Sequence, residues 1–316
     1  MLLGASADDN LFQLPDLESH LDDLASGGVN YLRNTMSGRN INGYEIRAYI
    51  EENGLYDLNK WNDTYWERLE NMLSLCAERK IIVQIEIWAT HDLFGLEWEK
   101  SPWNPLNNYN YDTSNTSLES AAPKFARFRH PFFHTVPNLV NDTLVLHYQQ
   151  QYVDHLLDIS FNYPNVLYCI TNEIQHAQDS GWSKYWARYI HEKASAVHKE
   201  IYVTEMFWAP DLKDPQHRIS IENPGLFNFF EASQNSAKSG QENWDNLQYV
   251  RQRLEARPRP VNAVKIYGKT GQVTWPGSDE EAIDRFWRNL LGGCASSRFH
   301  RNEKGIYGLG WSRLSK

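Results

Sequence analysis

The chain has 316 residues, of which 41% are hydrophobic and 22% are charged, and its formal net charge at pH 7 is −9. A chain of this length can bury one large core, as a single barrel or as two smaller domains. The acidic balance argues against a nucleic-acid binder, because Lys and Arg gather only in the short stretch 251–259, and the apolar runs are too short to span a membrane.

Strand-like apolar runs alternate with helical patterns along the whole sequence, which predicts a parallel sheet with helical crossovers. The expected strands cover residues 2–7, 29–35, 81–88, 165–171, 201–206, 226–230, 261–267 and 295–299. The expected helices cover residues 15–26, 61–80, 144–161, 183–199, 243–256 and 279–291. Eight such strands predict an α/β fold with one domain, residues 1–316, built as a single (β/α)8 TIM barrel whose eighth helix is short or missing.

A stretch rich in Asn, Pro, Tyr and Trp, residues 91–143, follows the third expected strand and has little periodicity. Loops of this length inside a compact domain are usually functional, and this one would leave the carboxyl end of its strand, on the active face of a barrel. Trp88 and His91, at its start, are therefore candidates for binding substrate. Flat aromatic faces pack well against sugar rings, although the same side chains could also form a core that holds the loop on the barrel.

The three cysteines, Cys76, Cys169 and Cys294, are far apart and lie in apolar surroundings, which favours buried thiols over disulfides or a metal site. No cofactor is expected, since the sequence has neither zinc-type ligand spacings nor a phosphate-binding glycine loop. The acidic pair at residues 8–9 could chelate calcium, but an isolated pair of this kind usually marks a helix entry.

The N-terminus shows no signal peptide, yet the chain opens almost directly on a strand, which suggests that a leader or a further domain was trimmed. We therefore expect a periplasmic or secreted protein if a leader was removed and a cytoplasmic one otherwise.

The strongest chemical signal is the pair Asn172-Glu173, which closes a short apolar run at residues 165–170. That run is typical of a buried strand. A carboxylate at the carboxyl end of a parallel barrel strand stands where barrel enzymes hold their chemistry. Although most glutamates simply face water, this context makes Glu173 the candidate general acid/base.

With this pair at the end of the fourth strand, the chain resembles the clan-A-type glycoside hydrolases, retaining enzymes on TIM barrels whose acid/base is the Glu of an Asn-Glu pair at that place. In some branches an Arg ends the second strand, where Arg33 stands here, and an aromatic follows the eighth, where Trp311 stands. The resemblance covers essentially the whole barrel. It implies hydrolysis of glycosidic bonds in a poly- or oligosaccharide, with Asn172 and Arg33 holding the sugar.

Within that group the nearest likeness is to poorly characterised, apiosidase-like bacterial families. Their seventh strand begins Lys-Pro-Val, and a glycine-rich step leads into their last strand. The runs Arg259-Pro260-Val261 and Leu291-Gly292-Gly293 are similar to that layout.

The sequence departs from the resemblance at the seventh strand, where the group carries its nucleophilic Glu. The run 260–268 has no carboxylate, and Lys265 lies near the expected place. A lysine cannot replace the nucleophile, because a glycosyl-enzyme ester needs an anionic oxygen. Glu205 and Glu231, at the ends of the fifth and sixth strands, are the candidates for the second carboxylate, and Glu231 would give the wider, inverting separation. Either could instead form a salt bridge at the barrel rim.

Two other interpretations follow from the same residues. Lys265, Arg298, His300 and Arg301 could form a basic floor with Arg33 for an anionic glycan, which would also permit a lyase. Alternatively, the protein could bind sugar without turnover, with its nucleophile lost. The full set of expected substrate-binding residues is Arg33, Trp88, His91, Asn172, Trp208, Lys265, Tyr267, Arg298, His300 and Trp311.

Overall fold

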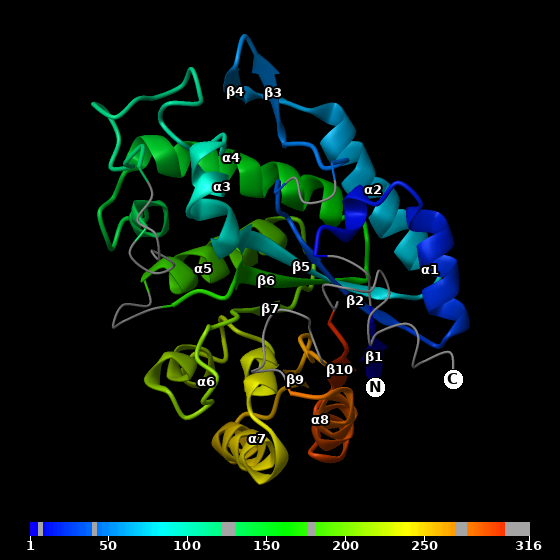
Figure 1. The fold of residues 1–316 in the computed structure, drawn as a ribbon. Coiled ribbons are helices and arrows are strands. Elements are labelled where there is room, and N and C mark those ends of the chain that lie inside the picture. Colours follow the sequence, from blue (N-terminus) through cyan, green and yellow to red (C-terminus); the bar gives the residue numbers. More distant parts are fainter. Residues whose placement is uncertain (6–8, 40–42, 122–129, 176–180, 269–276, 301–316) are drawn as a thin grey trace.

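The structure is a computed structural model of the chain that describes residues 1–5, 9–39, 43–121, 130–175, 181–268 and 277–300. Its frame is a six-stranded parallel sheet in the order β10-β1-β2-β5-β6-β7 (Figure 1). Among the described strands, the first and the last in sequence pair in parallel with each other. Its strands are β1 (Leu2–Gly4), β2 (Tyr31–Thr35), β5 (Ile82–Ala89), β6 (Val166–Asn172), β7 (Val203–Thr204) and β10 (Ser296–Arg298).

A second, two-stranded parallel sheet lies between β7 and β10. Its strands are β8 (Phe230–Glu231) and β9 (Val261–Asn262). On one side the N–H of Asn228 donates to the carbonyl of Val203 at 2.9 Å, and on the other the N–H of Ala295 donates to the carbonyl of Val261 at 2.8 Å. Backbone hydrogen bonds thus continue from β7 through this pair to β10, and the fold is an α/β barrel.

The helices lie around the outside of the strands (Figure 1). They are α1 (Leu17–Ser26), α2 (Asp63–Glu78), α3 (Leu96–Glu99), α4 (Thr143–Ser160), α5 (Gly181–Ala196), α6 (Arg218–Glu222), α7 (Gly240–Leu254) and α8 (Asp279–Leu291). The start of α8 is fixed by a capping box, in which Ser278 and Glu281 each accept from the other's backbone N–H. Among the described helices, none is both long and apolar enough to cross a membrane.

Close strand packing at the barrel's first strand requires a glycine. A Cβ on Gly4 would lie 2.4 Å from the carbonyl oxygen of Tyr31, on the neighbouring strand β2. It would also lie 2.7 Å from the side chain of Arg298, on β10. Only glycine lets β1 lie this close to both neighbours.

The alternation of strands and helices predicted from the sequence is confirmed, with boundaries that differ by a few residues. The predicted elements did not include residues 36–60. There β3 (Tyr49–Glu52) and β4 (Leu55–Trp61) form an antiparallel hairpin outside the barrel. Trp61, predicted as the first residue of the second helix, is instead the last residue of β4 and stacks on Tyr49 with ring centroids 5.1 Å apart. The helix α2 therefore begins at Asp63.

The stretch 91–143 was expected to be largely irregular, but its described part contains three short helices. These are a 3-10 helix at Thr90–Leu93, α3, and a second 3-10 helix at Pro131–His134. The fifth, sixth and seventh strands are shorter than predicted, with two residues each in β7, β8 and β9.

Candidate functional site

A cleft of about 490 Å³ opens at the carboxyl ends of the barrel strands. The residues that line it follow or end strands on all sides of the barrel, because parallel strands present their carboxyl ends on one face. Among the described residues the lining comprises Asp9, Arg33, Arg39, His91, Asn172, Glu173, Trp208, Pro210, Gln234, Ala237, Lys265, Tyr267 and His300. Eight of the residues expected from the sequence therefore meet in one place.

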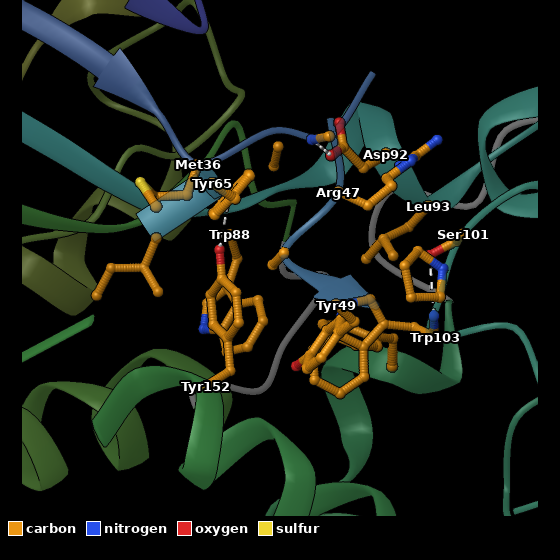
Figure 2. A pocket seen from close by; sticks show the side chains of 16 residues that line it. Met36, Arg47, Tyr49, Tyr65, Trp88, Asp92, Leu93, Ser101, Trp103 and Tyr152 are labelled. Atoms are coloured by element: carbon orange, nitrogen blue, oxygen red, sulfur yellow. Dashed lines mark hydrogen bonds between the residues drawn. The ribbon is translucent and has the colours of Figure 1, made fainter. Parts of the chain in front are cut away.

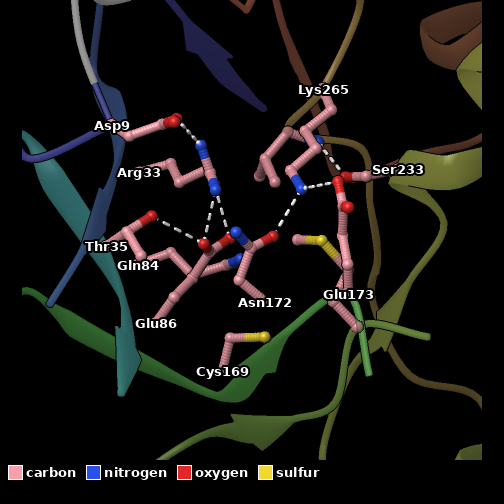
Figure 3. Close-up of polar contacts among 12 residues, drawn as sticks. Asp9, Arg33, Thr35, Gln84, Glu86, Cys169, Asn172, Glu173, Ser233 and Lys265 are labelled. Carbon is pink, nitrogen blue, oxygen red and sulfur yellow. Dashed lines mark hydrogen bonds and ion pairs between the residues drawn. The ribbon is translucent and has the colours of Figure 1, made fainter. Parts of the chain in front are cut away.

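Glu173 lies at the centre of one group of contacts in this cleft (Figure 3). Nζ of Lys265 lies 2.5 Å from Oε1 of Glu173 and 2.5 Å from Oδ1 of Asn172. The amide of Gln234 donates to the same Oε1 at 3.1 Å, and Nε2 of His91 lies 3.9 Å from Oε2. Glu173 also has a positive φ of 63°, which is uncommon for a residue with a Cβ. The local backbone is thus held in a costly conformation that aims this carboxylate into the cleft.

Arg33 is the centre of a second group of contacts, shown on the left of Figure 3. Its guanidinium binds Glu86 with two hydrogen bonds, at 2.5 and 2.6 Å, and donates to Asp9 at 2.5 Å. Both Arg33 and Glu86 are essentially inaccessible to solvent. Burial would lower the pKa of Arg33, but the charges of Glu86 and Asp9 raise it well above its ordinary value, so the side chain stays charged.

Asp9 has two further partners. Nη2 of Arg39 lies 3.5 Å from its Oδ2, and Nε2 of His300 lies 3.5 Å from its Oδ1. Arg39 in turn is 3.0 Å from Oδ1 of Asp92. Groups from several segments thus orient the carboxylate of Asp9. Through its ion pairs with Asp9 and Asp92, Arg39 also holds the loop after β2 at the rim of the cleft.

The sequence placed Glu205 and Glu231 at the mouth of the barrel beside Glu173, but neither lines the cleft. Glu205 is fully buried and accepts hydrogen bonds from the N–H of Thr171 at 2.8 Å and from the hydroxyl of Ser183 on α5 at 2.6 Å. Its carboxylate therefore turns toward β6 and α5. Burial raises the pKa of Glu205 to about 8.

Glu231 lies deeper in the barrel interior. Its carboxylate accepts hydrogen bonds from Ser233 and, at 3.3 Å, from Gln84 on β5. Gln84 accepts in turn from the hydroxyl of Tyr31 at 2.6 Å, and Asn262 donates to that hydroxyl at 3.0 Å. Glu231 thus belongs to a polar layer inside the barrel, and burial raises its pKa to about 7.

The expected basic floor is divided by the structure. His300 lines the cleft and packs edge-on against Tyr267, with ring centroids 4.7 Å apart. Arg298 is fully buried away from the lining and donates to the carbonyl of Val264 at 2.6 Å. Burial, together with the charge of Arg33, lowers the pKa of Arg298 to about 10. Arg301 and Trp311 lie outside the described residues.

Trp208 and Trp88 have different environments. Trp208 lines the cleft and is 38% exposed, so its ring can offer a face to a ligand. Trp88 is buried and lies within an aromatic cluster beside a separate cavity of about 50 Å³ (Figure 2). It packs against Tyr152 of α4 and Trp186 of α5, with ring centroids 5.2 and 5.6 Å away. Trp88 was expected to bind substrate, and the structure places it outside this cleft, with its ring enclosed by the helices outside the sheet.

Five cleft residues were absent from the expected set, and the polar ones among them are Asp9, Arg39 and Gln234. Asp9 follows the first strand and was visible in the sequence only as part of an acidic pair. Arg39 and Gln234 lie in connections whose sequence carries no distinguishing pattern. In the described part of the chain, no group of three or more His, Cys, Asp or Glu side chains could hold a metal ion.

Residues 47–219 match the model of a family described as "Domain of unknown function (DUF6298)". No curated protein matches the chain. The fold is similar to that of the endo-1,4-beta-mannanase from Rhizomucor miehei, with a TM-score of 0.63 and 12% identity over 98% of this chain and 90% of that one.

Two other solved structures show the same likeness. The glycoside hydrolase family 5 mannosidase from Rhizomucor miehei has a TM-score of 0.60 at 12% identity, over 94% of this chain and 80% of that one. The endo-1,4-beta-D-mannanase from Thermotoga petrophila RKU-1 has a TM-score of 0.58 at 13% identity, over 95% and 88%. At such low identity these likenesses establish the α/β barrel fold and nothing finer.

Proposed function

The chain belongs to the DUF6298 family, and from the geometry of its cleft we propose that it is a glycoside hydrolase acting on a poly- or oligosaccharide, with Glu173 as the general acid/base. We also infer that its parallel strands, β1, β2 and β5 to β10, make one eight-stranded (β/α)8 barrel. The fold that the chain shares with mannanases and a mannosidase supports both proposals.

One observation carries the proposal, namely the setting of Glu173. It follows Asn172 at the carboxyl end of β6, in a backbone conformation with a φ of 63°, and lines a cleft large enough for sugar residues. Strained backbone at such a position is typical of functional sites. The cleft also offers Trp208 and Tyr267 as aromatic faces for sugar rings.

Lys265 is the partner that would let Glu173 exchange a proton. Nζ of Lys265 lies 2.5 Å from Oε1 of Glu173, so a proton of the ammonium group can pass to the carboxylate along this hydrogen bond. Glu173 can then donate this proton to the glycosidic oxygen as the bond breaks.

The charges of the cleft favour a neutral glycan over an anionic one. Arg33 is matched by Glu86 and Asp9, and Lys265 is matched by Glu173. An anionic substrate would have to compete with carboxylates that already hold these cations. Hydroxyl groups of a neutral sugar can share them without that competition.

A second candidate function is sugar binding without turnover. It is favoured by Lys265, which stands near the place where the resembling hydrolases carry a nucleophilic Glu and which pairs directly with Glu173. Such a protein would bind oligosaccharides and release no reducing ends.

The test is reducing-end release from β-1,4-mannan and a panel of other neutral, uronate-containing and sulfated polysaccharides, with absorbance near 235 nm followed for lyase products. We expect release without an absorbance rise, reduced by about 10²-fold or more in Glu173→Gln, the typical scale of general acid catalysis. Glu99→Gln, an exposed carboxylate of α3 outside the cleft, is the matched control and should keep full activity. Full activity in Glu173→Gln would refute the proposal, and binding without release by the wild type would support the second candidate.

A further inference from the structure

We propose that Asp9 is the second carboxylate of this site and acts as the general base of an inverting hydrolysis. The proposal rests on the hydrolase function above. It assigns the second catalytic carboxylate, which the seventh strand lacks because Lys265 stands near that place. Among the described residues that line the cleft, the carboxylates are Asp9 and Glu173. Two carboxyl groups are what glycoside hydrolysis ordinarily requires.

The contacts of Asp9 suit a base. Its side chain is 6% exposed, and Arg33, Arg39 and His300 all direct nitrogen atoms at it, at 2.5, 3.5 and 3.5 Å. Positive charge and hydrogen-bond donors favour the ionised form of a carboxylate. A general base must be ionised before it can take a proton from water.

Asp9 and Glu173 stand well apart around the barrel. Asp9 follows β1 and Glu173 follows β6, and the strands β2 and β5 lie between them in the sheet order. Figure 3 shows the two side chains on opposite sides of the group, with Arg33 and Asn172 between them. A wide separation leaves room for a water molecule beside the sugar and is the arrangement of inverting enzymes.

The reaction then balances with the groups present. The oxygen of a water molecule forms a bond to the anomeric carbon while the bond from that carbon to the glycosidic oxygen breaks. Asp9 takes a proton from the water, and the glycosidic oxygen keeps the bonding electron pair and takes the proton of the Glu173–Lys265 pair. The sugar product carries the opposite anomeric configuration, and both groups return to their starting states through bulk water.

The other carboxylates near the cleft are less suited to this role. Glu86 does not line the cleft, and its carboxylate accepts two hydrogen bonds from Arg33 and one from the hydroxyl of Thr35 at 2.9 Å. Glu205 and Glu231 are buried, and their hydrogen bonds are made to groups inside the fold rather than toward the cleft. Asp9 alone of these four belongs to the cleft lining.

The experiment compares Asp9→Asn and Asp9→Ala with the wild type on a substrate that the wild type cleaves. Both variants should lose about 10²-fold or more of kcat. Added azide should restore turnover of Asp9→Ala by forming a glycosyl azide of inverted configuration, which replaces the activated water. Asp154→Asn removes an ion-paired aspartate on α4, far from the cleft, and should keep full activity.

The outcomes separate the two proposals. Proton NMR of the first wild-type product should show the inverted anomer, and a retained anomer would overturn the role of Asp9 as base. Turnover lost in Glu173→Gln but kept in Asp9→Asn would remove Asp9 while leaving the hydrolase, and loss in Glu231→Gln instead would assign the role to Glu231. If Asp9→Asn is unfolded by circular dichroism, azide rescue of a folded Asp9→Ala decides, and a folded variant without rescue counts against the proposal. No release by the wild type on any glycan would overturn both proposals.

Discussion

Arg33→Met should lower the free energy of unfolding by about 3–5 kcal/mol, the usual cost of removing one partner of a buried ion pair. The side chains of Arg33 and Glu86 are 1% and 0% exposed, and their two hydrogen bonds are 2.5 and 2.6 Å long. Methionine matches the aliphatic part of the arginine side chain and keeps its packing, so most of the loss would come from the charges and hydrogen bonds of the guanidinium. In the variant, Glu86 would keep the hydroxyl of Thr35 as a donor, while Asp9 would lose its shortest contact.

The matched control is Lys193→Met, because Lys193 forms a 2.8 Å ion pair with Asp154 whose side chains are 43% and 36% exposed. Exposed pairs of this kind contribute about 0.2–1 kcal/mol, since water screens the charges and the side chains lose freedom. Glu86→Gln made in the Arg33→Met background should cost less than in the wild type, because it removes a carboxylate that has already lost its cation.

Both effects can be measured by equilibrium urea unfolding, followed by tryptophan fluorescence and far-ultraviolet circular dichroism. The midpoint of Arg33→Met should fall well below that of Lys193→Met at similar slopes. Equal losses in the two variants would show that the buried pair is no more important to stability than the surface pair. That result would refute the reasoning from burial.

The remaining predictions concern a buried histidine and a helix cap. Burial lowers the pKa of His130 to about 3, whereas the pKa of a histidine in an unfolded chain is about 6.5. As the pH falls, the unfolded state therefore binds a proton first, and the free energy of unfolding should decrease between about pH 6.5 and pH 3. The asparagine in the variant His130→Asn would keep an acceptor for the N–H of Phe132 but would not titrate, so the urea midpoint should depend less on pH in that window. An unchanged pH dependence would show that groups other than His130 cause it. Ser278→Ala should cost about 1 kcal/mol by removing the cap of α8, Ser278→Asp should keep most of that stability, and equal unfolding midpoints for the two variants would contradict the capping role.

Much of the barrel was predictable because strands and helices have different hydrophobic periods. The hairpin β3–β4 was missed although the sequence signals it. Asn53 and Gly54 have φ values of 54° and 83°, as expected for the Asn-Gly turn that favours tight hairpins. The flanking run 49–61 alternates weakly, so only the turn residues could have indicated it.

The candidate site was predictable where it depended on position in a strand and not where it depended on pairing. Glu173 was found because a strand end can be read locally. Its pairing with Lys265 joins residues 92 positions apart, and it exists only because the barrel brings the end of β6 and the segment after β9 together. The burial of Glu205 and Glu231 likewise depends on which neighbouring groups donate to them, which the pattern of one strand does not contain.

The cleft balances its charges by pairing groups from different strands. Arg33 of β2 binds Asp9 after β1 and Glu86 of β5, and Lys265 after β9 binds Glu173 after β6. A lysine in place of a carboxylate after β9 changes the local charge by two, and it places a cation against Glu173. Each cleft carboxylate is thus oriented by a cation from another part of the barrel. A variant that weakens packing between the barrel strands should therefore disturb the contacts of Glu173 and those of Arg33 together.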